Sequence, residues 1–263
     1  MSVALRQPLG RVQRRATAAL VAREALRVAR VAPQTVGAAT LTGLLYLLIF
    51  GGALAERLGR VDGVAYASFV VPGLVVMTAV AQAFGGSSTS FMQARADGHL
   101  DALLTTPLRP WQLAAGYVAG GALRGLVAGA VVGALGSALA GAPADPLLAL
   151  AAPALATLAA AAGGLVAGIW AQTFDQQSML AMLVVQPLAM LGGVFYSANS
   201  LPAGWQRAVR LDPLFYLVDA ARAGFAGVHE APPPLSLSLA ALVGAAVFLL
   251  AVALLESGWR TRP

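Results

Sequence analysis

Cysteine and lysine are absent from this sequence of 263 residues, and histidine occurs only at His99 and His229. The lack of cysteine excludes disulfides, thiolate nucleophiles and cysteine-ligated metal sites. The lack of lysine excludes a Walker A motif, because the lysine of that motif contacts the nucleotide phosphates. We therefore expect no metal and no cofactor to be bound by this chain.

Charged residues are scarce as well. Only 11% of the residues are charged and 59% are apolar, against roughly 25% and 45–50% in an ordinary soluble domain. The apolar residues form six runs with at most one charge each, and every run exceeds the ~20 residues that a helix needs to cross a bilayer. These runs cover residues 31–55, 64–94, 110–144, 146–174, 176–206 and 231–255. The sequence therefore predicts an all-α membrane protein with six transmembrane helices.

The arginines are distributed unevenly around the predicted spans. Most of them lie before the first span, between the second and third spans, or after the last span. Because cytoplasmic segments are enriched in basic residues, both termini are expected in the cytoplasm. The net charge of +6 follows from this topology, so we expect no nucleic-acid partner.

Residues 1–32 combine apolar positions at helical spacing with Arg23, Arg27 and Arg30. This pattern predicts an amphipathic helix in the cytoplasmic interface, with its arginines turned toward anionic lipid headgroups. A solvated basic tail is the alternative. We favour the helix because Pro33 is placed to end it where the first span begins, so residues 33–263 would form the transmembrane domain.

The longest predicted cytoplasmic loop covers residues 95–109. Its leucines fall on one face of a short helix that also carries two aspartates, and a Thr-Pro pair ends that helix. Apolar residues exposed on such a loop need a cover, which is either the bilayer surface or a partner protein. The site residues in this loop are Arg95, Gly98, His99, Leu100, Asp101, Leu103, Leu104, Thr106, Pro107 and Arg109.

The third span carries two further features. Gly121, Gly125, Gly129 and Gly133 recur at four-residue intervals, which allows another helix to approach closely, either within one chain or across a dimer. Arg124 is the one charge well inside a span, where it must face protein or water. It lines a transport path or ties two helices together, with Asp175 or a glutamine such as Gln82 as partner.

The segment 196–234 is too long for a turn and too apolar for a soluble loop. It is expected to fold back into the outer leaflet as a re-entrant helical hairpin, at about 198–230, before the last span. Catalytic clusters are missing: the two histidines are expected on opposite sides of the membrane, and the serines near 87–90 lack a nucleophile-elbow pattern.

Several ordered motifs resemble those of the type-2 ABC exporter permeases, which include daunorubicin-resistance, nodulation-factor and polysaccharide-export permeases. The motifs are FVVPGL at 69–74, GHLDALLTTP at 98–107, GYVAGGALRG at 116–125, AQTFD at 171–175, LGGVFYS at 191–197, LPAGW at 201–205 and DPLFY at 212–216. Together they cover the chain from about Val31 to the last span. Many members of the family have glutamate at Asp101 and asparagine at Asp212.

The resemblance implies a homodimer in the bacterial inner membrane, with separate cytoplasmic ATPase subunits that bind ATP and magnesium. It makes residues 95–109 the coupling helix that contacts the ATPase, and residues 1–32 an interfacial connecting helix in contact with membrane lipids. The implied function is export of an amphipathic, lipid-linked or drug-like compound. The chain itself would not be an enzyme. A membrane-embedded lipid enzyme and a passive channel are the alternatives.

Overall fold

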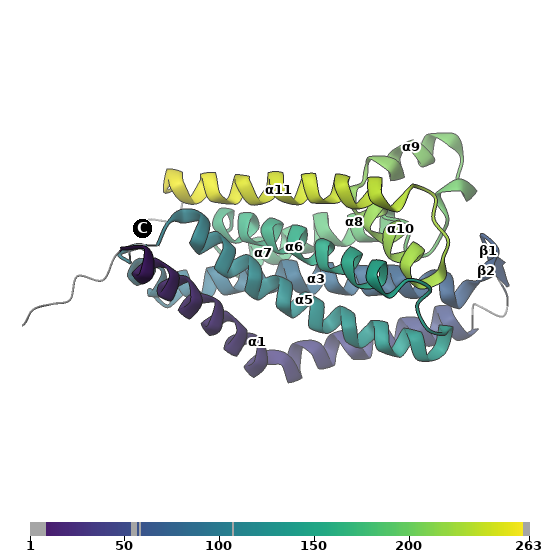
Figure 1. The fold of residues 1–263 in the computed structure, drawn as a ribbon, viewed down its shortest axis with the longest axis horizontal. Helices are drawn as coiled ribbons and strands as arrows, with labels where there is room; N and C mark the ends of the chain where they lie inside the picture. The colour runs from purple at the N-terminus through teal and green to yellow at the C-terminus, as the bar shows by residue number, and fades with distance from the viewer. Residues whose placement is uncertain (1–8, 54–56, 58, 107, 260–263) are drawn as a thin grey trace, which may run out of the picture.

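The computed structural model describes residues 9–53, 57, 59–106 and 108–259 of the chain. It is an elongated bundle of helices that run roughly along one axis (Figure 1). Both ends of the described chain lie at one end of this bundle, together with α4 (His99–Leu104), and we call this the α4 end. The opposite end carries α9 (Ala203–Leu211) and the hairpin of β1 (Arg60–Val61) with β2 (Val64–Ala65), and is called the α9 end.

Four helices in the described chain are long and apolar enough to cross a membrane: α3 (Tyr66–Ala96), α5 (Pro110–Ala140), α6 (Pro146–Trp170) and α11 (Pro233–Ser257). Three of them begin with proline, which lacks the N–H that a first helical residue would leave unpaired. Asp145 caps α6 by accepting hydrogen bonds from the amides of Leu147 and Leu148. These helices match four of the predicted runs to within a few residues.

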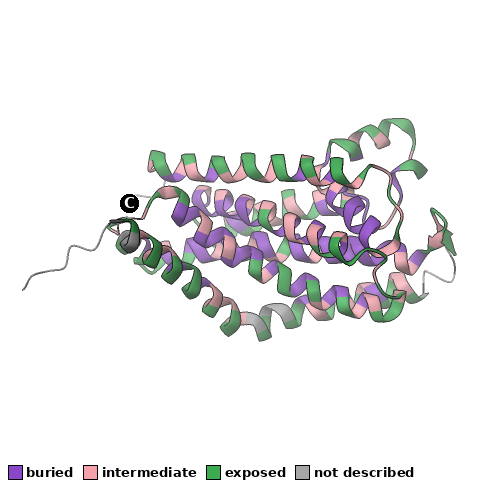
Figure 2. Cartoon of the chain, in the orientation of Figure 1, coloured by how far each residue is buried: buried purple, intermediate pink, exposed green. Residues whose placement is uncertain are grey.

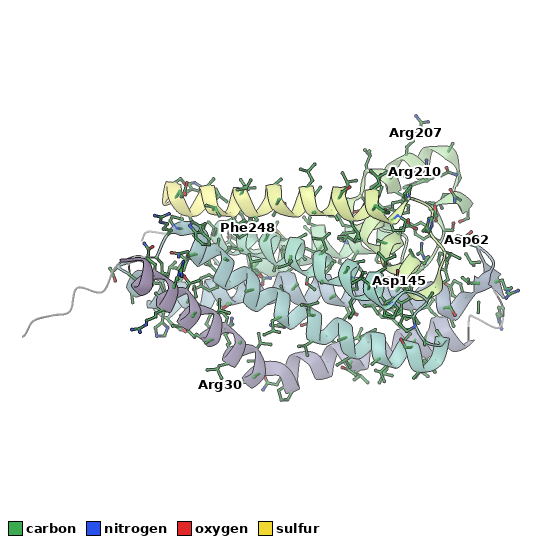
Figure 3. All side chains as sticks on the ribbon, in the orientation of Figure 1. Arg30, Asp62, Asp145, Arg207, Arg210 and Phe248 are labelled. Carbon is green, nitrogen blue, oxygen red and sulfur yellow. The ribbon has the colours of Figure 1, made fainter. Side chains whose placement is uncertain are left out.

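The first predicted run has a different form from the one expected. Helix α1 (Leu9–Leu48) continues through Pro33, so the prediction that this proline ends an interfacial helix is wrong. Instead α1 bends, and Arg30 lies beside the bend (Figure 3). A proline inside a helix bends it because its ring displaces the preceding turn. A short π-helical turn, η1 (Ile49–Ala53), follows α1.

The fifth predicted run is shorter than the sequence indicates. It forms α7 (Phe174–Leu180), the π-helical turn η2 (Ala181–Val185) and α8 (Gln186–Leu191), which follow one another without a break. The chain then turns at Gly192 and Gly193, where the second glycine has a φ of +78°. The left-handed backbone at Gly193 ends the helix, so the helical part of this run stops shortly before residue 196, where the predicted fold-back segment begins.

The segment 198–230 contains η3 (Ala198–Ser200), α9 and α10 (Pro213–Ala226). Helix α10 packs against α3, α6 and α11, and most of its side chains are buried. Helix α9 lies outside the bundle, and Figure 3 shows Arg207 on its outward side. One helix of the segment therefore belongs to the protein interior and the other to its surface.

Helix α3 is the centre of the bundle. It packs most extensively against α5 and α6, and 72% of its most apolar window is buried, against 11% for α11. Figure 2 shows the same contrast, with buried residues along the middle helices and exposed ones along α11 and the N-terminal half of α1. A movement of most other elements would therefore change the contacts of residues on α3.

Candidate functional site

The connection from α3 to α5 at the α4 end is a tight, well-defined structure. Gly98 has a φ of +70°, a left-handed backbone that favours glycine and allows α4 to begin directly after α3. Thr106 ends α4 by donating from Oγ1 to the carbonyl of Leu103, at 2.5 Å. The backbone N–H of Arg109 then donates to Gln112 Oε1 at 2.9 Å and begins α5. Pro107 lies outside the described residues.

The leucines of α4 are covered by the bundle itself. Leu100 is 2% exposed and packs in a cluster with Leu20, Leu113 and Tyr117, and Leu103 is partly buried against the same cluster. The expectation that these leucines need a lipid or protein cover is therefore wrong for Leu100. The side chains of Asp101 and Leu104 are outside the description.

The outward face of the α4 segment is formed by small and polar residues. His99, Ala102 and Thr105 are exposed, and the His99 ring lies 4.0 Å from the Asp97 carboxylate. Both of those side chains are at least half exposed. Among the described residues of α4, this polar face is the exposed one.

Arg95 faces inward, toward the end of α6. Its guanidinium donates to three carbonyls there, at 2.5 Å from Gly168, 3.0 Å from Ala171 and 3.3 Å from Ile169. The last carbonyls of a helix lack partners within the helix and carry partial negative charge, so an arginine stabilises them. Arg95 therefore links the α3–α4 junction to the α6–α7 junction.

The four predicted glycines of α5 face α3 of the same chain. A Cβ on Gly121 would lie 2.8 Å from the carbonyl oxygen of Ala83, and one on Gly129 would lie 3.0 Å from Ala79 Cβ. Gly125 meets the same stretch of α3, whereas Gly133 has only ordinary contacts, with nearest atoms at 3.5 and 3.6 Å. The close approach thus occurs within one chain and is tightest around Gly121 and Gly125.

Arg124 lies next to this ridge, and its Nε donates to Gln82 Oε1 at 3.0 Å. Gln82 is one of the two partners considered from the sequence. The Arg124 side chain also lies against Gly86 of α3, whose hypothetical Cβ would be 3.1 Å from Arg124 Cδ. The charge is thus held by a neutral amide between α3 and α5.

A stripe of polar residues continues along α3 from Gln82 in both directions. Thr78, Gln82, Thr89 and Gln93 of α3 and Asp97 directly after it recur at intervals of four or seven residues, and none of them is fully buried. This spacing places them on one helix face. At the Thr78 end the stripe borders a cavity of about 220 Å³ that is also lined by Thr42, Tyr46 and Gln186. The sequence analysis missed this stripe, although its spacing is visible in the sequence.

Near the α4 end, Glu24 of α1 is buried, with 2% of its surface exposed. Its Oε2 accepts from the hydroxyl of Ser90 at 2.6 Å, and its Oε1 lies 2.9 Å from Nη2 of Arg23. Arg27 is 3.8 Å away on the next turn. A carboxylate in this position is stable because these groups compensate its desolvation. The sequence signal for this cluster, which the sequence analysis missed, is that Glu24 is the single acidic residue among the first 55 residues.

A second buried charge pair lies in α10. Asp219 and Arg222 are 0% and 1% exposed and 3.9 Å apart. Asp219 accepts from the amides of Glu230 and Ala231, while Arg222 donates to the carbonyl of Gly193 at 2.6 Å. The pair therefore fixes α10 to the turns on either side of it. Its i, i+3 spacing inside an apolar helix was the missed sequence signal.

No group of three or more potential metal ligands occurs within the part of the chain that the structure describes. His99 lies in α4, and His229 follows α10 near Asp62 at the opposite end. The two histidines are therefore too far apart to share a site. The sites with chemical character are the α4 segment, the stripe on α3 and the Glu24 cluster.

Comparison with known proteins decides the family. The model of the ABC-2 type transporter family matches residues 15–226. The chain belongs to this family. As an ABC-2 type transporter chain, it is 32% identical over 238 residues to the inner membrane transport permease YadH of Escherichia coli K12, covering 90% of this chain and 93% of YadH.

The chain is also similar to nodulation proteins over a shorter part of its length. This chain is 29% identical to nodulation protein J of Rhizobium meliloti over 68% of its own length. It is 33% identical to nodulation protein J of Rhizobium leguminosarum bv. trifolii over the same share of its length. The predicted family resemblance is confirmed. As a member of this family the chain is a transport permease subunit, and its apolar helices are those of a multi-pass protein of the bacterial inner membrane.

Proposed function

We propose that this chain is the membrane subunit of an ATP-driven exporter that moves an amphipathic, lipid-linked or drug-like compound outward. A separate subunit hydrolyses the ATP, and two copies of the chain enclose the path. The family membership and the missing Walker lysine support this division of labour. Six spans, cytoplasmic termini and a re-entrant hairpin of α9 and α10 complete the proposed topology.

The observation that carries the proposal is the link between the α4 segment and the bundle. The turn at Gly98 joins α4 directly to the central helix, and Arg95 joins the same point to the end of α6. A force applied to the exposed face of α4 is therefore applied to α3 and α6 together. Discrete rearrangement of packed helices is how such a movement would open a path.

The transport path is proposed to follow the polar stripe of α3. Arg124 and Gln82 lie at its middle, and a charge inside a membrane protein is expected to face water, protein or a transported group. The Arg124–Gln82 bond supports a structural tie as well, and the two roles are compatible in one residue. The remaining apolar surface of α1 and α7–α8 is available for a second copy of the chain.

The test uses the full chain and its ATPase partner in proteoliposomes. Ala102→Trp places a bulky side chain on the exposed face of α4, and Ala203→Trp does the same at the opposite end. We expect Ala102→Trp to reduce the permease-dependent stimulation of ATP hydrolysis at least about tenfold, because a ~1.4 kcal/mol loss of binding is sufficient for this. Ala203→Trp should leave it unchanged. Equal stimulation by both variants would contradict the coupling role.

The direction of transport has its own test. In inside-out vesicles, an exporter accumulates its cargo in the lumen when ATP is added. A short-chain fluorescent phospholipid serves as an amphipathic probe. We expect ATP-dependent accumulation in vesicles that contain both subunits. Equilibration of the probe across the membrane without ATP would favour a passive channel, and chemical conversion of the probe would favour a lipid enzyme.

A further inference from the structure

A cavity of about 460 Å³ lies at the α4 end, between the N-terminal half of α1 and α3. Its volume is in the range of small-ligand sites in proteins. Three arginines and two carboxylates line it, together with amide, hydroxyl and imidazole groups. The polar lining residues are Arg23, Glu24, Arg27, Arg30, Ser90, Gln93, Asp97 and His99.

The positive charge of this cavity is only partly compensated. Glu24 is engaged with Arg23 and Ser90, and it is 3.8 Å from Arg27. The other contact of Arg27 is with a neutral group, the Oε1 atom of Gln93 at 2.9 Å. Asp97 is exposed at the rim and lies 4.0 Å from His99. One arginine therefore remains in excess over the carboxylates of the lining.

A fourth arginine, Arg124 of α5, lies beyond the cavity, beside the polar stripe of α3. Arg124 is held by Gln82, and no carboxylate is described in contact with it. Arg124 is held by Gln82 and Arg27 by Gln93, and both glutamines belong to the polar stripe of α3. Two arginines beside one polar stripe, of which Arg124 has no carboxylate described in contact with it, can both be stabilised by an anion.

Several of the remaining lining residues are apolar, namely Leu26, Val31 and Ala94. The cavity also lies where α1 bends away from α3 at the level of Arg30 (Figure 3). Basic pockets between membrane helices on the side of the interface accept lipid headgroups. An anionic group attached to an apolar tail fits this combination better than a small hydrophilic anion does.

We propose that the cavity between α1 and α3 binds the phosphate group of an anionic amphiphile, with Arg27 as its principal contact and Arg124 as the next positive group along the path. This deepens the proposed function and rests on it, because it places the charged end of the cargo at the α4 end. Glu24 and Gln93 hold the Arg27 guanidinium in place. The polar stripe then offers hydroxyl and amide groups to the same phosphate further along α3.

The test measures lipid binding to the full chain in nanodiscs, without any ATPase, with phosphatidic acid as the probe. Arg27→Gln and Arg124→Gln should each weaken binding about tenfold, the loss expected for one charge-assisted contact. Arg14→Gln removes an equal charge from an exposed part of α1 and should leave binding within about twofold, since a lone exposed charge contributes little. Arg27→Lys keeps the charge and should bind better than Arg27→Gln.

A competition measurement distinguishes a lipid phosphate from a free one. Glycerol 3-phosphate that displaces the lipid would show that the phosphate alone is recognised, and failure to displace it would show that the tail is needed as well. Equal binding of phosphatidylcholine, or an equal loss in Arg14→Gln, would overturn the proposal. A melting curve of each variant excludes loss of folding. Because no ATPase is present, failure here leaves the coupling test with Ala102 unaffected.

Discussion

Ser90 donates a 2.6 Å hydrogen bond from its hydroxyl to Oε2 of Glu24, and this bond joins the central helix α3 to the N-terminal half of α1. Glu24→Ala removes the acceptor and leaves Arg23 and Arg27 without their carboxylate. We expect a loss of about 2–4 kcal/mol in the free energy of unfolding, because a broken buried pair leaves uncompensated charge. Thermal unfolding in detergent measures it.

Two comparisons complete that prediction. Glu24→Gln keeps an acceptor for Ser90 and should lose less stability than Glu24→Ala. Glu256→Ala removes an exposed carboxylate near the end of α11 and should have little effect. A Glu24→Ala protein as stable as the Glu256→Ala protein would show that the Glu24 cluster does not stabilise the fold.

The glycines of α5 should differ in their tolerance of a methyl group. Gly121→Ala places a Cβ 2.8 Å from the carbonyl oxygen of Ala83, whereas Gly133→Ala meets only side-chain atoms at 3.5 Å and beyond. We expect Gly121→Ala to lower the unfolding free energy by about 1–3 kcal/mol through overpacking. Gly133→Ala should be neutral or stabilising, since alanine favours a helix. Similar melting temperatures for the two variants would refute the assignment of the tight contact.

Asp212 should make stability depend on pH. It is 3% exposed between α9 and α10, and burial raises its pKa to about 6 from 3.8. A raised carboxyl pKa means that its contribution is fully present below about pH 4 and is lost as the pH rises through 6. At about 1.4 kcal/mol per unit, the loss by pH 7.5 is at most about 3 kcal/mol.

The variant Asp212→Asn checks this dependence. Asparagine can still accept from the amide of Leu214, as Asp212 Oδ1 does at 2.9 Å, but it cannot ionise. We expect the variant to be more stable than the wild type at pH 7.5 and equally stable near pH 4. Asp145→Asn changes the exposed cap of α6 in the same way and should leave the melting temperature unchanged at both pH values. A variant less stable than wild type at pH 7.5 would contradict this prediction.

Arg95 should affect both stability and coupling. Arg95→Gln loses donors to the carbonyls of Gly168 and Ala171, and we expect a loss of about 1–3 kcal/mol in unfolding free energy. ATP hydrolysis should then become less dependent on the permease. Arg207→Gln removes an exposed arginine on the outward side of α9, at the opposite end of the bundle, and is the matched control. Tightly coupled hydrolysis in Arg95→Gln would show that this contact transmits nothing.

The sequence was sufficient to predict much of the bundle. The long apolar runs and the prolines at their starts predict α3, α5, α6 and α11, because length and hydrophobicity alone determine a membrane helix. The partner of Arg124 was among the alternatives as well, since Gln82 is a polar residue inside a neighbouring span. The helices depend on local sequence and can therefore be predicted from it.

Features that depend on tertiary packing were harder to predict. Pro33 is a helix breaker by local rules, yet α1 continues through it because its two halves both pack on α5, through Leu20 and Gly43. Leu100 was expected on a free surface because the approach of α1 to α4 is invisible in the sequence. Only the three-dimensional structure shows that Arg222 is buried beside Asp219.

The bend in α1 has a consequence for biogenesis. The apolar part of this helix, Gly37–Gly52, has 16 residues and is ~24 Å long, less than the ~30 Å of a bilayer core. Gly43 and Leu20 find their packing surfaces on α5, at Val132 and Gly116. While the ribosome is still translating the residues before α5, the first helix therefore lacks the surface that holds it. The order of synthesis therefore leaves α1 without its packing partner until α5 has been made.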